Sequence, residues 1–93
     1  MIQSFRCKET EKIWQGAPSR KLPPDIQRTA LRKLIALNQA EQLSDMRMPP
    51  SNRLEALKGN RVGRYSIRIN DQWRICFIWK ECDAFEVEII DYH

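Results

Sequence analysis

The second half of the chain alternates apolar and polar residues, and this pattern restricts the fold more than any other feature. The alternation runs through YSIRI (65–69), QWRICFIW (72–79) and FEVEI (85–89). A period of two places the apolar side chains of a strand on one face of a sheet. Short turn-like segments separate the three runs, so neighbouring strands should pair antiparallel. The side chains expected on the core face are Tyr65, Ile67, Ile69, Trp73, Ile75, Phe77, Trp79, Phe85, Val87 and Ile89.

The first half has helical spacing instead. CKETEKIWQG (7–16) predicts a short helix that Thr10 or a neighbouring polar residue caps and Gly16 ends. After a proline pair, an apolar stripe predicts a second helix from Asp25 to about Leu43. MIQSF, at the start, alternates enough for a short strand. We therefore expect an α+β fold with two helices on one face of an antiparallel sheet and the other face open.

Length and composition limit the class of protein. Ninety-three residues, 42% of them hydrophobic, support one domain over residues 1–93 and make a fully disordered chain improbable. The sequence has no apolar run long enough to span a membrane and no apolar stretch of a signal peptide, so a cytoplasmic protein without a membrane partner is expected.

The cysteines indicate neither a disulfide framework nor a metal site. Cys7, Cys76 and Cys82 are odd in number and form no C-x-x-C pair, and the chain has a single histidine. We expect no metal and no other cofactor. Cys76 lies in an apolar run and is expected to be a small buried side chain.

Basic residues are concentrated in the segment from Arg53 to Arg74. The whole chain carries a formal charge of +4, and this segment holds six basic residues against two acidic ones. Strand alternation places Arg68 and Arg74 on the open face of the sheet, together with Ser66. A charge run is often only a solvated face, but a basic face next to a Lys-Gly turn at residues 58–59 also suits a nucleic-acid backbone. The basic side chains expected to bind such a backbone are Arg53, Arg61, Arg64 and Arg68.

The only histidine is His93, the last residue, directly after Asp91 and Tyr92. A terminal histidine is often an inert tail or an expression scar. By alternation Asp91 and His93 have the parity of the core face, and Tyr92 has that of the open face. The three side chains can act together only if the chain leaves the ladder or forms a bulge there.

Taken together, RLEALKGNRVGRYSIRINDQWRICFIW and the terminal VEIIDYH resemble the HigB branch of the RelE/ParE toxin superfamily. The resemblance covers nearly the whole chain, and its most specific parts are EALKG, SIRINDQWRI and DYH. Asn60 stands where the family often has Asp, at a position on which the chemistry does not depend.

This resemblance implies a β-α-α-β-β-β fold and a toxin that cleaves translated messenger RNA on the ribosome and so inhibits translation and growth. The family's catalytic residues map onto Lys58, Arg74, Asp91, Tyr92 and His93. Metal-independent cleavage needs a base for the 2′-OH, positive charge on the phosphorane and an acid for the leaving oxygen. Histidine can take either proton role at neutral pH, and a permanently charged arginine suits phosphate oxygens.

The resemblance also implies partners. These are a helix-turn-helix antitoxin of the HigA kind encoded beside the toxin, the 70S ribosome, mRNA and, only through the antitoxin complex, operator DNA. Two other functions remain open at this stage. One is a non-hydrolytic toxin of the ParE kind that inhibits DNA gyrase, and the other is a basic RNA-binding module without catalysis.

Overall fold

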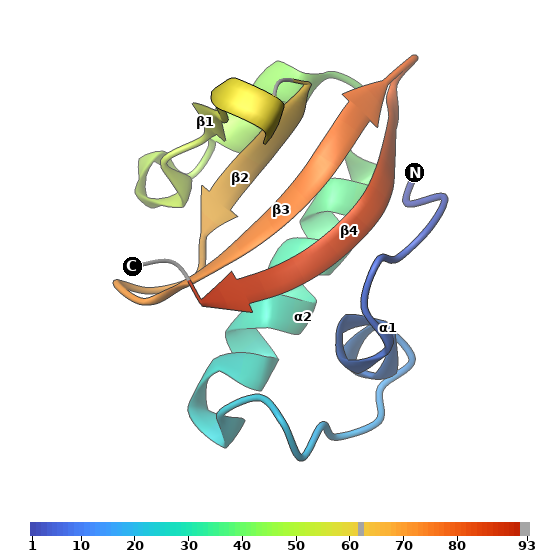
Figure 1. The fold of residues 1–93 in the computed structure, drawn as a ribbon, viewed down its shortest axis with the longest axis vertical. Coiled ribbons are helices and arrows are strands. Elements are labelled where there is room, and N and C mark those ends of the chain that lie inside the picture. Colours follow the sequence, from blue (N-terminus) through green and yellow to red (C-terminus); the bar gives the residue numbers. More distant parts are fainter. Residues whose placement is uncertain (62, 92–93) are drawn as a thin grey trace.

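The computed structural model describes residues 1–61 and 63–91. Four antiparallel strands lie in the order of the sequence: β1 (Glu55–Ala56), β2 (Arg64–Arg68), β3 (Trp73–Lys80) and β4 (Asp83–Asp91). Two α-helices, α1 (Lys8–Trp14) and α2 (Pro24–Gln39), precede the sheet, and α2 crosses behind β3 and β4 in Figure 1. This arrangement confirms the expected α+β fold. Within the described residues, no helix is both long enough and apolar enough to span a bilayer.

The core lies between the sheet and the helices, as the alternation predicted. Ile67, Ile75 and Phe77 are fully buried on the helix side of the sheet. They meet the apolar stripe of α2, which consists of Ile26, Ala30, Leu34 and Leu37. Fully burying an aliphatic or aromatic side chain contributes roughly 1.5–3 kcal/mol, so this layer supplies much of the stability.

A β-bulge interrupts β4 and corrects one expectation. Cys76 pairs with Glu88 while Ile78 pairs with Phe85, so β4 contains one extra residue at this point. Glu86, at the bulge, has a positive φ of 50°, and its N–H donates to Ser4 Oγ at 2.9 Å. Because a bulge changes the parity of a strand, Ala84 faces the core in place of Phe85.

The segment before α1 pairs with β4 without forming a regular strand. Ile2 and Phe5 make isolated parallel bridges to Ala84 and Val87. The strand expected over residues 1–5 is therefore present only as these two bridges. They cover the outer edge of β4, where the chain runs beside it in Figure 1, and so protect an edge that would otherwise be open.

The helix boundaries follow the sequence in part. Prolines occupy the first turn of α2, and Gly16 follows α1 with φ +84°, both as expected. However, α2 ends at Gln39, and residues 43–47 form a separate 3₁₀ turn, η1 (Leu43–Arg47). Thr10 does not cap α1, because it is fully buried and its hydroxyl accepts a hydrogen bond from Ile89 N at 2.9 Å.

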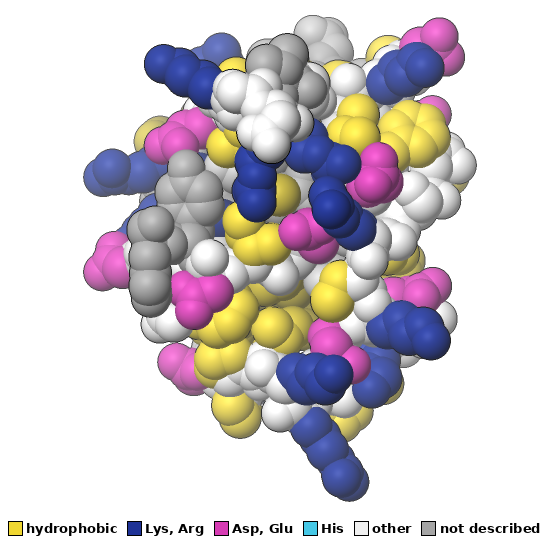
Figure 2. Space-filling view, in the orientation of Figure 1, with side chains coloured by type: hydrophobic (Ala, Val, Ile, Leu, Met, Phe, Trp, Pro, Cys, Tyr) yellow, Lys and Arg dark blue, Asp and Glu magenta, His cyan; other side chains and the backbone are white. Residues whose placement is uncertain are grey.

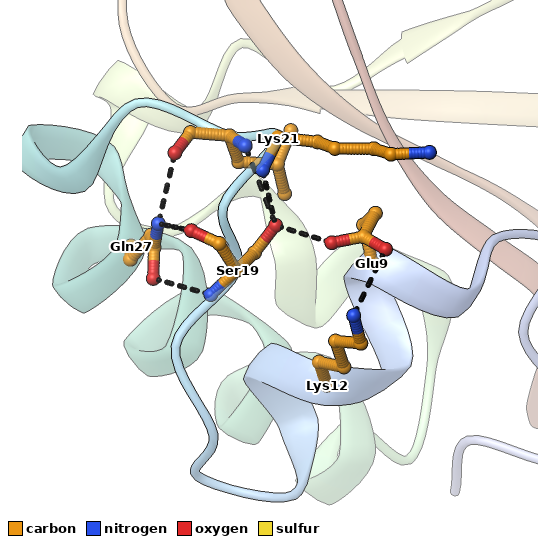
Figure 3. Close-up of polar contacts among 6 residues, drawn as sticks. Glu9, Lys12, Ser19, Lys21 and Gln27 are labelled. Atoms are coloured by element: carbon orange, nitrogen blue, oxygen red, sulfur yellow. Dashed lines mark hydrogen bonds and ion pairs between the residues drawn. The ribbon is translucent and has the colours of Figure 1, made fainter.

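A polar cluster fixes the loop between the two helices (Figure 3). Ser19 Oγ donates to Glu9 of α1 at 2.6 Å and accepts from the N–H groups of Lys21 and Leu22. The Gln27 amide of α2 accepts from Ser19 N and donates to the carbonyls of Ser19 and Leu22. The loop is thereby attached to both helices through side chains, although it has no regular structure of its own.

Candidate active site

Arg74 lies on the sheet face opposite the helices, but it is not on an open surface. It is 6% exposed, and its neighbours on that face, Ser66 and Cys76, are 0% and 2% exposed. The parity predicted for these side chains was right. The expectation that Ser66 and Arg74 are open was wrong, because the loop before β1 packs against this part of the sheet.

The Arg74 guanidinium is held by acceptors from two segments. Nε donates to Ser66 Oγ at 2.9 Å, and Nη2 donates to the carbonyl of Arg53 at 2.6 Å and to that of Ser66 at 3.4 Å. Arg53 follows the 3₁₀ turn η2 (Pro50–Asn52) and has a left-handed backbone, with φ 46° and ψ 57°. These acceptors are neutral oxygen atoms, and they hold the guanidinium at the end of β2 where Arg68 pairs with Arg74.

Arg74 and two further cations, Arg61 and Arg64, act electrostatically on the buried Cys76. Burial raises the pKa of the Cys76 thiol to about 11, and the nearby Glu88 carboxylate acts in the same direction. The charges of Arg61, Arg74 and Arg64 oppose this rise in pKa. Cys76 is thus a buried, unreactive thiol, as expected, and all three arginines are close enough to affect its pKa.

The exposed turn after β1 carries Lys58 and Arg61. It contains a third 3₁₀ turn, η3 (Gly59–Arg61), and Arg61 N donates to the Lys58 carbonyl at 3.3 Å. In Figure 1 this turn lies in front of the sheet, on the side away from α2. Lys58 follows Leu57, which bonds to Arg64, whereas Arg74 pairs with Arg68 at the other end of β2. The two predicted cations therefore start from opposite ends of β2.

Carboxylates partly neutralise the predicted RNA-binding arginines. Arg64 forms an ion pair with Glu86 at 3.3 Å, and Arg68 forms one with Asp71. From residue 40 onward the sequence has eight basic and nine acidic residues, so the excess positive charge of the chain lies before that point. Figure 2 shows basic and acidic side chains interleaved over the upper part of this face. Among the predicted binding residues, Arg53 and Arg61 are the exposed ones.

Asp91 is the last described residue of the predicted catalytic group. It pairs with Trp73 and accepts a hydrogen bond from Gln72 Nε2 at 3.1 Å. It therefore stays in the ladder with the parity of the helix side, as expected, while Arg74 and its partner Ile90 point to the other face. Tyr92 and His93 lie outside the described residues.

Sequence reasoning missed the groups that hold Arg74. Ser66 was placed on its face by alternation, but its role as an acceptor was not foreseen. The Arg53 carbonyl gave no sequence signal, since a backbone oxygen has no pattern of its own. Within residues 1–61 and 63–91, no cluster of three or more His, Cys, Asp or Glu side chains could hold a metal ion.

Two solved structures share the fold of this chain. The chain superimposes on the structure titled YoeB-YefM complex from Staphylococcus aureus with a TM-score of 0.62 and 18% identity, covering 100% of this chain and 95% of that one. It superimposes on YafQ from E. coli with a TM-score of 0.60 and 13% identity, covering 98% and 91%. At these identities the likeness concerns the fold alone.

Sequence comparison then defines the family. The chain is 40% identical over 80 residues to Toxin HigB-1 of Vibrio cholerae, covering 85% of this chain and 84% of the relative. It is 31% identical to Endoribonuclease HigB of Proteus vulgaris over the full length of both. Residues 3–93 match the family model for HigB-like toxins, described as the RelE-like toxin of type II toxin–antitoxin system HigB. The protein belongs to this family, and the resemblance read from its motifs is confirmed.

Proposed function

We propose that this protein is a ribosome-dependent endoribonuclease that cleaves translated mRNA and so arrests growth. The observation that carries the proposal is the fixed Arg74 guanidinium, which shares its sheet face with Arg64 of β2. A fixed guanidinium suits the negative charge that develops on a phosphorane. The membership in a toxin family and the name of the Proteus vulgaris relative, an endoribonuclease, support the same reaction.

The proposed chemistry is attack of the 2′-OH on the adjacent phosphate without a metal. His93 acts as general acid or base, since imidazole is the only side chain with an unperturbed pKa near neutrality. Asp91 orients the imidazole or balances its charge, and Tyr92 stacks on a base or donates a hydrogen bond. Arg74 and Lys58 stabilise the phosphorane, and Arg53, Arg61, Arg64 and Arg68 bind the RNA or the ribosome.

The partners follow from this role. A toxin of a type II system is neutralised by an antitoxin, and we propose that the antitoxin is a helix-turn-helix protein of the HigA kind. Operator DNA is then bound only through the antitoxin complex. The substrate complex is the 70S ribosome with its mRNA, and the ribosome positions the RNA at a site that is incomplete in the toxin alone.

The test is a paired growth and primer-extension assay without antitoxin. Wild type should stop growth and cut a translated message but leave the same message uncut when its start codon is removed. His93→Gln should lower cleavage about 10²–10⁴-fold, whereas Arg28→Gln, an exposed change on α2, should cut like wild type. Toxicity with no cut message, together with inhibited gyrase supercoiling, would replace this proposal by the ParE-like function.

A further inference from the structure

The side chain of Arg74 is oriented by two segments that are distant in sequence. Its Nε is bonded to Ser66 Oγ on the neighbouring strand, and its Nη2 is bonded to the carbonyl of Arg53 in the loop before β1. A guanidinium is planar, and its donors point in fixed directions. Bonds at two of its nitrogens therefore fix the plane of the group as well as its position.

Ser66 lies inside the sheet, where its hydroxyl accepts the hydrogen bond from Arg74 Nε. It is fully buried, pairs with Cys76 on β3 and with Glu55 on β1, and shares the face of Arg74. A serine at a buried strand position is neither a good strand former nor a good core residue. Its hydroxyl is satisfied by Arg74 Nε at 2.9 Å, and this bond accounts for a polar side chain there.

The left-handed backbone at Arg53 sets the direction of its carbonyl group, which accepts a hydrogen bond from Arg74. Arg53 has φ 46°, a left-handed conformation that is unfavourable for a non-glycine residue. The buried Asn52 amide holds this turn through bonds to the carbonyls of Met46 and Met48, both at 3.1 Å. Lys33 of α2 donates to the Asn52 side-chain oxygen, and burial lowers the pKa of this lysine.

We propose that Ser66 and the left-handed turn at Asn52–Arg53 are positioning residues that orient the Arg74 guanidinium for the scissile phosphate. The inference rests on the proposed function, because it concerns how the assigned cation is aimed. Neither group needs to touch the RNA. Displacement of a catalytic group by about 1 Å costs up to about 10²-fold in rate, so loss of either support should lower the rate of the chemical step and leave substrate binding unchanged.

The first experiment compares Ser66→Ala with Ser66→Thr. Single-turnover cleavage is measured on programmed ribosomes over a range of toxin concentrations, which separates the rate at saturation from the half-saturating concentration. Ser66→Ala should lower the saturating rate roughly 10–100-fold and leave the half-saturating concentration within twofold. Ser66→Thr keeps a hydroxyl and should restore most of the rate. The control Ser44→Ala, at an exposed position of η1, should match wild type.

A second series separates the backbone of Arg53 from its charge. Arg53→Asn and Arg53→Val both remove the cation, but asparagine tolerates a left-handed backbone and β-branched valine does not. The Asn variant should keep the saturating rate and lose only affinity. The Val variant should lose affinity equally and also lower the saturating rate about tenfold or more. Equal saturating rates in the two variants would overturn the role of the turn.

A third readout does not depend on activity. In an NMR spectrum of the free toxin, the Arg74 Nε–H should exchange slowly with solvent, because it is buried and bonded to Ser66. Ser66→Ala should accelerate this exchange at least tenfold, and Ser44→Ala should not change it. Unchanged exchange in Ser66→Ala would overturn the inference even if cleavage falls.

The outcomes of the proposed function and of this inference remain distinguishable. If wild type cuts no translated message, the proposed function fails, and the orientation of Arg74 for a phosphate fails with it. If wild type cuts and Arg74→Gln cuts equally fast, the endoribonuclease activity stands, but the catalytic role given to Arg74 and the positioning inference are both overturned. If Arg74→Gln is slow and Ser66→Ala is as fast as wild type, the cation matters but Ser66 does not position it.

Discussion

Replacement of Ser19 by alanine should destabilise the protein although Ser19 is far from the catalytic residues in sequence. Its hydroxyl takes part in three hydrogen bonds, one donated to Glu9 and two accepted from Lys21 N and Leu22 N (Figure 3). Ser19 and Leu22 are 6% and 8% exposed, so water has little access to replace the lost acceptor. The change therefore leaves backbone donors unsatisfied inside the loop.

The size of the destabilisation follows from the two hydrogen bonds that Lys21 N and Leu22 N donate to the Ser19 hydroxyl. A buried donor left unsatisfied costs about 1–3 kcal/mol, and loss of a serine that caps backbone N–H groups costs about 0.5–2 kcal/mol. The bonds are long, at 3.2 and 3.3 Å, so each belongs near the lower end of these ranges. We expect Ser19→Ala to lower the free energy of unfolding by about 2 kcal/mol, which lowers Tm by roughly 8–16 °C for a chain of this size.

The measurement is urea unfolding at pH 7, with Ser44→Ala as a control for an exposed serine in a 3₁₀ turn. The control should change stability by less than about 0.5 kcal/mol. If Ser19→Ala costs no more than the control, the loop is not held by this hydroxyl, and the reasoning from the polar cluster is wrong.

The same variant should have a pH-dependent effect. The hydrogen bond from Ser19 is the largest cause that lowers the pKa of Glu9 below its ordinary value of 4.5, with Lys12 adding to it. A carboxyl with a lowered pKa in the folded state stabilises the fold above its unfolded pKa, and this contribution is lost as the pH falls through the folded value. The stability difference between wild type and Ser19→Ala should therefore be largest near pH 7 and narrower below pH 4. An identical difference at pH 7 and pH 3 would exclude a contribution from Glu9.

Three further predictions follow from buried and strained positions. Iodoacetamide at pH 8 should modify the exposed Cys82 first and Cys76 last, because Cys76 is buried with a pKa near 11; peptide mass spectrometry gives the order, and early labelling of Cys76 would contradict its burial. Cys82→Gly should stabilise the protein by roughly 0.5–1 kcal/mol in thermal unfolding, because Cys82 has φ 69° in the hairpin between β3 and β4 and glycine adopts this conformation readily. Thr10→Val should destabilise it by about 1–3 kcal/mol, because Ile89 N loses its buried acceptor; an unchanged urea midpoint would mean that the strand does not need this bond.

The sequence predicted the layers of the fold because each pattern was long and regular. The alternation around Ile67, Ile75 and Phe77 and the stripe of α2 leave only one way to bury the apolar side chains. The bulge at Glu86 was not predictable, since a positive φ at a glutamate leaves no signal in the sequence. The resulting error fell on Phe85, for which strict alternation had been assumed.

The sequence predicted which residues form the candidate site, but it did not predict their burial or their hydrogen-bond and ion-pair partners. The parity of Arg74 followed from the alternation, and its proposed role came from the family motif. Its burial depends on the loop at Asn52–Arg53, which is held by the hydrogen bonds that the Asn52 amide donates to the carbonyls of Met46 and Met48 rather than by any local pattern. The sequence pattern of β2 alone also could not predict that Arg64 forms an ion pair with Glu86 of β4.

Because β4 contains a bulge, the number of residues after the bulge determines which face of the sheet each later side chain occupies. Between Glu86 and Asp91 each residue alternates faces, so the number of residues in this span decides on which side Asp91 emerges. Deleting one of them would exchange the two faces for everything downstream and move Asp91 to the side of Arg74. In an alignment of relatives, gaps in this span should therefore be absent or come in compensating pairs. The face on which Asp91 lies thus depends on the number of residues between the bulge and Asp91 rather than on which residues they are.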